Sequence, residues 1–582
     1  MTPKLSSFHS KVTIKRKVPI PMRDGVNLTA DIYRPKGVDV PLPVLLMRLP
    51  YGRAIASTVT YAHPSWYANR GYIVVIQDVR GCGTSGGEFY PFRHEYEDGF
   101  DTVQWCAQIL SGTNGKVGMY GFSYQGVTQF QAAVMQPAGL TTICPAMATA
   151  DFYHGWFYFG GALCLDFVLT WALQLTQNRA QFLKQEPQAT QLFEAQKQME
   201  RWLNFAPLDR LELFQSEAQE SVKHFWFDWI GNQQPNDPYW QKLNPVSYFD
   251  RYDIPALHIA GWSDLFIEAT LNTYHMAKLA TRQPQHLVVA PWQHMPWLPK
   301  VGEVDFGEAA ISHIDELQID WFDYWLKGID NGIVTQRQGS RLRSDRKPTA
   351  QLFLMGENRW LILQDFNDKN SNLDKYRKNK DLFLHDKHQL KAEKATIESL
   401  PDIYVYDPRL PNPSTAYVPC DQRSTHQRWD VLVYKGDVLA ENLSIAGTAE
   451  FTLYAVTSAP DTDWVIKLLD IHPDGKQMLV SMGVLRAKFH KSWEAAEWID
   501  TDLVTEYKIR LRPTCYSFLS GHRIGVAIAS AAFPLIERHS NTKQSPTSAN
   551  VSDFIEATQQ IYHSGEFPSC LHLPLLTGEF RA

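Results

Sequence analysis

The 582-residue chain lacks several features that would place it in a specialised class of proteins. Its seven cysteines are scattered without a CxxC pair, so neither a disulfide framework nor a cysteine zinc site is indicated. No run of 18 apolar residues occurs, and the N-terminal stretch has no continuous apolar segment of the kind found in secretory signals. We therefore expect a soluble, cytoplasmic protein whose thiols are reduced.

The chain also lacks an excess of positive charge. Lysine and arginine number 56 against 62 aspartates and glutamates, which gives a net charge of −6 at pH 7. A nucleic-acid-binding surface or a polybasic membrane patch requires clustered positive charge. We therefore expect no nucleic acid and no membrane as a partner, and the sequence leaves a homo-oligomer open.

Aromatic residues, in contrast, are abundant. They make up 13% of the chain and include 18 tryptophans, which is more than packing alone requires. A chain of this length exceeds what one hydrophobic core usually organises, so two to four domains are expected. The excess of large aromatic side chains suggests apolar pockets within or between them.

Strand and helix patterns divide the chain into four segments. Residues 1–146 alternate β-rich and helical stretches, which predicts the first part of a mostly parallel α/β core. Residues 147–246 are aromatic and helical and predict an inserted cap, after which residues 247–349 resume the α/β pattern. Residues 350–582 contain short strands separated by turn residues, which predicts a jelly-roll domain. Within them, the charged segment 365–394 is expected to be a solvated loop and helix.

One serine stands in a stretch that favours a sharp turn. GKVGMYGFSYQGVTQF, residues 115–130, places Ser123 between a strand pattern and an amphipathic helix, with Gly121 before it and Gly126 after it. Such a turn lifts a nucleophilic serine out of a sheet. The usual motif has its second glycine where this chain has Gln125. A structural serine that caps the helix therefore remains the alternative.

A serine hydroxyl becomes a nucleophile only when a histidine, oriented by a carboxylate, removes its proton. Asp264 follows the strand pattern IPALHIAGWS, and His294 follows HLVVAPWQ. In sheets of this kind the acid and the histidine come after the serine, each just past the end of a strand. The rival residues lie before, at the start of or inside strands: Asp253, His258 and His286. The order predicts a triad of Ser123, Asp264 and His294.

A second motif competes with this interpretation. Gly81, Gly83 and Gly86 form GxGxxG directly after a strand pattern, as in dinucleotide-binding proteins. Such a site also needs an acidic residue at the end of the next strand, about 20 residues on. That region, residues 97–108, reads as a helix. A dinucleotide-binding or otherwise non-catalytic α/β protein is kept as the alternative of another class.

Five stretches together resemble a known family. GFSYQG, LPYGR, QDVRGCGTSGGEF, GWSD and APWQH are similar to the cocaine esterase/NonD (CocE/NonD) hydrolases, relatives of the X-Pro dipeptidyl peptidases and the α-amino-acid ester hydrolases. The resemblance spans nearly the whole chain and implies an α/β-hydrolase core, a helical cap and a C-terminal jelly-roll (galactose-binding-like) domain. It implies that Ser123 is the nucleophile, His294 the general base and Asp264 its orienting acid. It also implies an oxyanion hole made by the backbone N–H of Tyr124 and the hydroxyl of Tyr51.

The subclasses of this family differ in how they hold the substrate. The α-amino-acid ester hydrolases bind the substrate ammonium with carboxylates, whereas here Leu265 and Phe266 follow Asp264. We find no acidic pair clearly placed to bind an N-terminal amine. The predicted acyl pocket is therefore apolar and lined by aromatic residues: Trp156, Phe157, Trp171 and Phe266.

These observations predict a serine hydrolase, namely a carboxylesterase that cleaves esters with an apolar acyl group through an acyl-enzyme on Ser123. The alternative within the enzyme class is an X-Pro dipeptidyl peptidase, amidase or acyltransferase that uses the same triad. The expected partner is a small-molecule ester or a short peptide as substrate. The chemistry needs no metal or organic cofactor, and we expect none.

Overall fold

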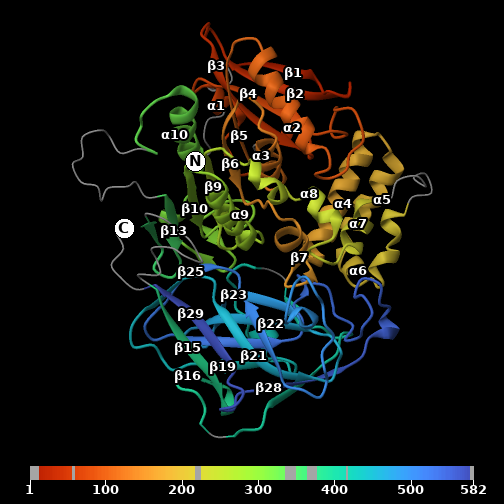
Figure 1. Cartoon of the computed structure of the whole chain (residues 1–582), viewed down its shortest axis with the longest axis vertical. Helices are drawn as coiled ribbons and strands as arrows, with labels where there is room; N and C mark the ends of the chain where they lie inside the picture. Colours follow the sequence, from red (N-terminus) through yellow and green to blue (C-terminus); the bar gives the residue numbers. More distant parts are fainter. Residues whose placement is uncertain are drawn as a thin grey trace.

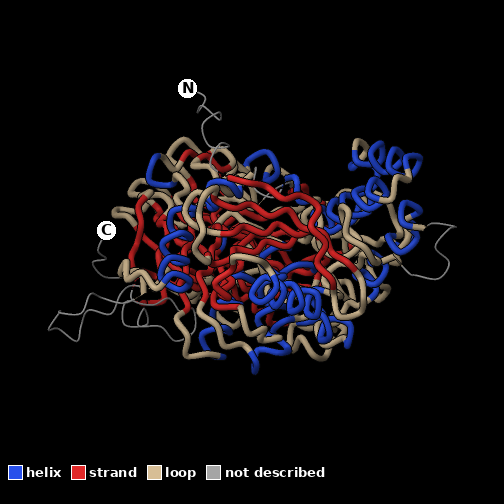
Figure 2. Tube along the Cα trace, turned by 90° about the horizontal axis from the view of Figure 1, so that it is seen from above, coloured by secondary structure: helices blue, strands red, loops and turns tan. Residues whose placement is uncertain are grey.

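The computed structural model describes residues 12–55, 59–215, 224–334, 349–363, 377–396, 398–414 and 417–576. Figure 1 shows an α/β core, a group of helices beside it and a large β domain below both. In the view from above, strands fill the middle of the molecule and helices lie around them (Figure 2). The fold class predicted from the sequence is confirmed. No helix among the described residues is long and apolar enough to cross a membrane.

The core is built on a sheet of ten strands in the order β1-β2-β4-β3-β5-β6-β9-β10-β13-β14. The strands from β4 through β13 pair in parallel, and antiparallel pairs flank them at both ends. Strands such as β4 and β10 are buried along their whole length because helices cover both faces. The strands are β1 (Val12–Pro21), β2 (Asn27–Pro35), β3 (Leu42–Leu49), β4 (Ile73–Asp78), β5 (Thr113–Phe122), β6 (Leu140–Ala146), β9 (Ala256–Gly261), β10 (Gln285–Ala290), β13 (Ala350–Leu354) and β14 (Arg359–Leu363).

Helices cover the two faces of this sheet. α1 and α10 pack on one face, where Tyr67 and Trp321 are fully buried. α2 and α3 pack on the other face, where Val103 and Phe130 are buried. The helices of the core are α1 (Pro64–Ala68), α2 (Glu95–Gln104), α3 (Tyr124–Val134), α9 (Ile267–Ala280) and α10 (Ile314–Lys327), with shorter turns η3 (Arg53–Ile55), η4 (Trp105–Ile109), η9 (Pro245–Arg251) and η10 (Glu308–Ala310). A two-stranded sheet, β11 (Lys300–Val301) and β12 (Val304–Asp305), precedes η10.

The segment between β6 and β9 forms the cap and is mostly helical. Its helices are α4 (Leu165–Phe182), α5 (Glu186–Gln196), α6 (Met199–Leu203), α7 (Phe225–Gly231) and α8 (Pro238–Leu243), with turns η5 (Tyr153–Phe157), η6 (Leu208–Arg210) and η7 (Glu212–Phe214). A short hairpin joins η5 to α4 and consists of β7 (Tyr158–Phe159) and β8 (Ala162–Leu163). Buried tryptophans fill the interior of the cap, as its aromatic sequence suggested.

The C-terminal domain contains a second network of thirteen strands. Its strands are β15 (Arg377–His385), β16 (Gln389–Lys391), β17 (Asp402–Tyr406), β19 (Leu432–Lys435), β20 (Leu443–Gly447), β21 (Glu450–Thr457), β22 (Asp463–Ile471), β23 (Gln477–Arg486), β24 (Thr505–Arg510), β25 (Thr514–Phe518), β26 (Arg523–Ala529), β28 (Ala557–Tyr562) and β29 (Cys570–Leu576). β18 (Pro413–Ser414) and β27 (Phe533–Pro534) form a separate pair, and the helical elements are α11 (Arg423–His426), η11 (Asp386–His388), η12 (Ala487–Phe489) and η13 (Val551–Asp553). An apolar core that includes Leu453, Trp464 and Phe518 lies inside this all-β domain.

Two expectations about the region after residue 349 differ from the structure. β13 pairs in parallel with β10, so residues 350–363 extend the core sheet, although the predicted jelly-roll domain began at residue 350. An edge hairpin of the core and a jelly-roll hairpin have the same alternating pattern, which is why the sequence did not separate them. The loop and helix expected over 365–394 are also wrong where the chain is described, because β15, η11 and β16 occupy 377–391. Residues 364–376 lie outside the described residues.

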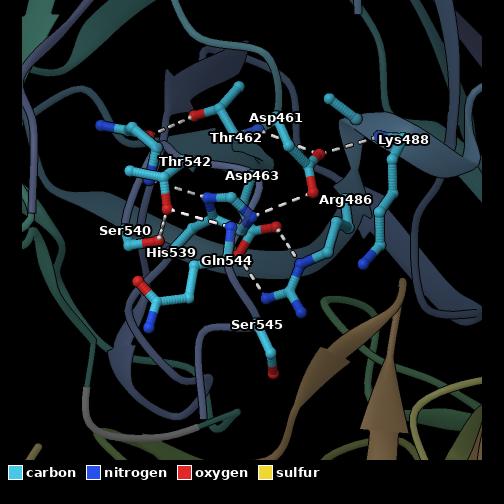
Figure 3. A network of polar contacts seen from close by, with 12 residues as sticks. Asp461, Thr462, Asp463, Arg486, Lys488, His539, Ser540, Thr542, Gln544 and Ser545 are labelled. Carbon is cyan, nitrogen blue, oxygen red and sulfur yellow. Dashed lines mark hydrogen bonds and ion pairs between the residues drawn. The ribbon is translucent and has the colours of Figure 1, made fainter. Parts of the chain in front are cut away.

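A buried polar network of the C-terminal domain, which includes Asp463 and Arg486 (Figure 3), also contacts the cap. Arg486 is fully buried and forms ion pairs with Asp463 and Glu537, each at 2.9 Å. Glu537 accepts a hydrogen bond from the backbone N–H of Leu163 in β8, and the backbone N–H of Arg486 donates to Gly160 in the cap hairpin. The cap hairpin is therefore held by the C-terminal domain.

Candidate active site

Ser123 occupies the turn between β5 and α3. Its backbone angles are φ +60° and ψ −129°, a conformation that a residue with a Cβ rarely adopts and that costs about 1–3 kcal/mol. Two backbone hydrogen bonds hold it, because Ser123 donates to Ala146 at 2.9 Å and accepts from Gly126 at 2.8 Å. Strained serines of this kind are typical of the nucleophile turn in hydrolase sheets.

Packing explains why the second glycine of the serine motif stands at position 126 rather than 125. A Cβ on Gly126 would lie 2.5 Å from the Cβ of Ala148 and 3.1 Å from the carbonyl of Ala146, so α3 could not approach β6 with any other residue there. The side chain of Gln125 lies instead against Gly121, where an added Cβ would be 2.5 Å away. Gly126 therefore permits the close approach of α3 to β6, one residue later than the glycine of the usual motif does.

Asp264 and His294 meet beside this turn. Asp264 follows β9, His294 follows β10, and Oδ1 of Asp264 lies 2.8 Å from Nδ1 of His294. The Asp264 side chain is fully buried, whereas that of His294 is 19% exposed. The ring of Phe122, which directly precedes Ser123, lies 5.4 Å from the His294 ring. Because Asp264 occupies Nδ1, the ring nitrogen left for other chemistry is Nε2.

The rival residues lie elsewhere. His258 is fully buried in β9 and its Nε2 lies 2.9 Å from Oε1 of Gln285. Burial lowers the pKa of His258 to about 4, so this ring is neutral at physiological pH. His286 lies at the start of β10 and packs against Trp321. Asp253 accepts a hydrogen bond from the hydroxyl of Thr281.

Tyr51 and Tyr124 place donors near the serine. The Tyr51 hydroxyl accepts a hydrogen bond from Nε1 of Trp171 at 3.1 Å, which leaves its own hydrogen to donate. Burial raises the pKa of Tyr51 to about 12, although its polar contacts with Trp171 and Ser123 act in the opposite direction. Tyr124 is the first residue of α3, so its backbone N–H has no acceptor within the helix.

Three of the four predicted pocket residues surround these groups. Phe266 packs edge-on against His294 at 5.1 Å and stacks on Trp156 at 4.3 Å. Trp171 contacts Tyr51, as described above. Phe157 lies one layer further back, where it packs against two buried tryptophans of the cap, Trp229 and Trp240.

Phe167 was missed by the sequence analysis. Its ring stacks on Trp171 at 5.9 Å and contacts both Trp156 and Phe266. The signal was present, because Phe167 precedes Trp171 by four residues and therefore shares a face of α4 with it. The aromatic cluster beside His294 thus includes Phe167 as well as Trp156, Trp171 and Phe266.

Arg512 was also missed, and no local pattern points to it. It belongs to the C-terminal domain, yet its Nη2 donates a hydrogen bond to the backbone carbonyl of Asp264. The guanidinium carbon lies 4.1 Å from the centre of the Tyr417 ring, and burial lowers the pKa of Arg512. The loop that carries Asp264 is therefore held from a second domain.

The glycine-rich stretch packs around a carboxylate of the chain itself. Asp78 ends β4 and accepts hydrogen bonds from the backbone N–H groups of Arg53 and Thr84. A Cβ on Gly83 would lie 2.0 Å from a carboxylate oxygen of Asp78, so the glycine permits this contact. The volume that a phosphate would need beside these N–H groups is filled by Asp78, which speaks against the dinucleotide interpretation.

Comparison with known proteins assigns the chain to a family. A family model described as X-Pro dipeptidyl-peptidase (S15 family) matches residues 24–296, and one described as X-Pro dipeptidyl-peptidase C-terminal non-catalytic domain matches residues 343–572. Cocaine esterase from Rhodococcus sp. (strain MB1 Bresler) is 31% identical over 97% of this chain and 99% of its own. The chain belongs to the S15 family, with cocaine esterase and its CocE/NonD relatives.

Two solved structures support the fold of this S15 family member. An aminopeptidase from a marine sediment Thaumarchaeota archaeon has a TM-score of 0.79 at 23% identity and covers 99% of this chain and 98% of that one. An α-amino acid ester hydrolase has a TM-score of 0.76 at 22% identity, with 99% and 100% covered. The predicted enzyme class, a serine hydrolase, is confirmed by the family. Arg512, which contacts Asp264, belongs to the domain of this S15 member that matches the family model described as non-catalytic.

Proposed function

We propose that this protein hydrolyses carboxylic esters with an apolar acyl group through an acyl-enzyme on Ser123. The observation that carries the proposal is the hydrogen bond between Asp264 and His294 beside the strained serine turn. The relationship to cocaine esterase, whose name describes cleavage of an ester, supports the same reaction.

In this mechanism, Oγ of Ser123 attacks the ester carbonyl while Nε2 of His294 takes its proton. Asp264 fixes the tautomer of His294 and stabilises the imidazolium that forms. The negative charge on the former carbonyl oxygen is stabilised by the backbone N–H of Tyr124 and the hydroxyl of Tyr51. The bond between the acyl carbon and the alcohol oxygen then breaks, and the leaving oxygen takes the proton from His294. Water attacks the acyl-enzyme in the same way and releases the acid.

The aromatic cluster supports an apolar acyl group. Phe266 contacts the His294 ring and stacks on Trp156, and both side chains are 1% exposed, so buried apolar side chains border the reacting groups on the side of the acid loop. Apolar surface favours neutral aryl or branched acyl groups, because these lose little hydration when they bind. The substrate we propose is accordingly a small neutral ester.

A second candidate substrate is a short X-Pro peptide, which the description of the matching family model favours. The same serine, histidine and aspartate would perform this reaction, with the amine of the second product as the leaving group. A panel that pairs a phenylacetyl ester with an X-Pro anilide separates the two. Faster turnover of the anilide would make the peptidase the main activity.

The triad is tested with a fluorophosphonate, whose phosphorus is attacked by an activated serine with loss of fluoride. We expect the label on the peptide that contains Ser123 and no label in Ser123→Ala, which should also lose ester turnover. Ser530→Ala in the C-terminal domain, where the hydroxyl contacts Tyr404, is the matched control and should be labelled normally. A label on another serine would refute the assignment.

We also propose the cytoplasm as the compartment, because all seven cysteines are free thiols and six of them are buried. Thiols persist in a reducing compartment. Fractionation of the cells that make the protein tests this, and recovery from an exported fraction would contradict it.

A further inference from the structure

Two neighbouring turns of the second sheet bring an aspartate and two histidines together. Asp470 lies near the end of β22, His472 directly follows that strand, and His522 directly precedes β26. β22 and β26 are adjacent antiparallel strands in which Asp470 pairs with Ile524. The three side chains therefore meet at one end of the sheet, although 50 residues separate the two turns in the sequence.

Their ligand atoms have the spacing of a coordination shell. Nδ1 of His522 lies 2.9 Å and 3.0 Å from the two carboxylate oxygens of Asp470, and Nε2 of His472 lies 3.5 Å from Oδ2. One ligand atom from each of the three residues lies within 4.8 Å of the others. Nitrogen and oxygen atoms bound tetrahedrally to zinc at about 2.0–2.2 Å are about 3.3–3.5 Å apart. Small side-chain movements would bring all three to one ion.

The charge of Asp470 needs a positive partner. Its side chain is 2% exposed, and among the described residues no lysine or arginine forms an ion pair with it. Its contacts are the two histidines and the hydroxyl of Tyr516, which donates to Oδ2 at 2.8 Å. A buried carboxylate is costly without a balancing charge. A divalent cation bound by the carboxylate supplies such a charge.

The backbone around the histidines is already fixed. The N–H of His472 donates to Lys476 within its turn, and the N–H of His522 donates to Leu519 within the other. The two imidazole rings are 4.3 Å apart, and the His472 side chain is 32% exposed, so an ion can enter from solvent. Binding of a metal ion would therefore have to order little of the backbone.

We propose that Asp470, His472 and His522 bind one Zn²⁺, with water in the fourth position. Two imidazoles favour zinc over magnesium or calcium, which prefer oxygen ligands. The hydroxyl of Tyr516 orients the carboxylate from outside the coordination shell, as hydrogen-bonding partners of metal ligands commonly do. The ion joins the two turns and stabilises the second sheet. It takes no part in the ester chemistry proposed above, so the two proposals can fail separately.

Calorimetric titration of the full-length protein with ZnCl₂ after dialysis against EDTA tests the proposal. We expect one Zn²⁺ per chain and a rise in melting temperature with zinc concentration, because an ion that binds only the folded state stabilises it. His472→Ala and His522→Ala should each lose this binding. His490→Ala is the matched control, because this half-buried histidine of the same domain contacts the backbone carbonyl of Ala487 and the ring of Tyr507 and none of the three proposed ligands. It should bind zinc normally.

The Tyr516→Phe variant distinguishes a preformed zinc site from adventitious binding of zinc to the exposed His472. Loss of an outer hydrogen bond to a metal ligand typically weakens affinity about 10–100-fold, so we expect that decrease here. Circular dichroism of each variant without metal verifies that it is folded. The proposal is overturned if the wild type binds no more zinc than the His472→Ala variant, or if Tyr516→Phe binds zinc as tightly as the wild type.

Discussion

Arg512 donates a hydrogen bond from its guanidinium to the backbone carbonyl of Asp264. The two residues are 248 positions apart in the sequence and belong to different domains. Because Asp264 holds His294, the position of the proposed base depends on the C-terminal domain. In the mechanism proposed above, Arg512 is a positioning residue.

Arg512→Met should lower kcat by about 10- to 100-fold and change KM little, since small displacements of catalytic groups cost rate far more than binding. Steady-state kinetics on a phenylacetyl ester measures both constants. Arg523→Met is the matched control, because Arg523 also donates to a backbone carbonyl of this domain, that of Gly436, at 3.0 Å. Equal kcat values for the two variants would show that the contact with Asp264 does not matter for the reaction.

Tyr51→Phe should remain folded and lose kcat, because it removes a donor aimed at charge that forms only in the transition state. Loss of one such donor typically costs about 10²–10³-fold. Tyr158→Phe provides the comparison, since that buried hydroxyl donates to the carbonyl of Trp229 within the cap. If a folded Tyr51→Phe enzyme keeps the wild-type kcat, Tyr51 does not contribute to the oxyanion hole.

A phenylacetyl ester should have a higher kcat/KM than the phenylglycyl ester of the same leaving group, at a pH where the amine is charged. An ammonium brought against Phe266 and Trp156 loses hydration. Contact with an aromatic face recovers only about 0.5–2 kcal/mol of that cost. An amino ester that is preferred tenfold or more would refute the apolar acyl site and favour the aminopeptidase-like alternative.

Arg486→Met should destabilise the folded protein by about 3–5 kcal/mol, because it leaves Asp463 and Glu537 buried without their cation. Denaturant unfolding followed by tryptophan fluorescence measures the change. Arg409→Met removes an exposed arginine that pairs with Asp407, and it should leave the unfolding midpoint where it is. A midpoint for Arg486→Met equal to that of the wild type would contradict the importance of the buried network.

Stability should fall below about pH 4 in a way that depends on Asp461. Burial raises the pKa of this carboxyl, but the nearby charges of His539 and Arg486 outweigh burial and the net pKa is lowered. A folded-state pKa below the unfolded value of about 3.9 stabilises the protein above that pH. The contribution is lost as the pH falls through the folded-state pKa. Melting temperatures from pH 7 to pH 3 should therefore drop more steeply for the wild type than for Asp461→Asn, and parallel curves would refute this.

Local patterns were sufficient to find the elements that carry the candidate site. A strand followed by a turn at Ser123, Asp264 and His294 is visible in the sequence, and the parallel order of β5, β9 and β10 then brings the three turns to one edge of the sheet. That edge is where the pair of Asp264 and His294 lies. The roles of these residues stay predictions until the labelling experiment is done.

Local sequence patterns could not predict contacts between segments that are far apart in the sequence. Arg512 follows an ordinary strand, and only the packing of two domains brings it to Asp264. Phe157 and Trp156 are neighbours in one aromatic segment, yet only Trp156 faces Phe266, since the winding of η5 turns adjacent side chains in different directions. The strand β15 was hidden by the charged residues of its first half, although it pairs with β29 and its Leu382 and Leu384 are buried in the core of the C-terminal domain.

The cap hairpin also restricts how genes of this family can be recombined. A Cβ on Gly160 would lie 1.9 Å from the carbonyl oxygen of Val484, so the hairpin fits the second sheet with no space to spare. Chimaeras that take the cap from one relative and the C-terminal domain from another would join surfaces that were selected separately. We therefore expect such chimaeras to fold best when residues 158–163 and 484–486 come from the same relative.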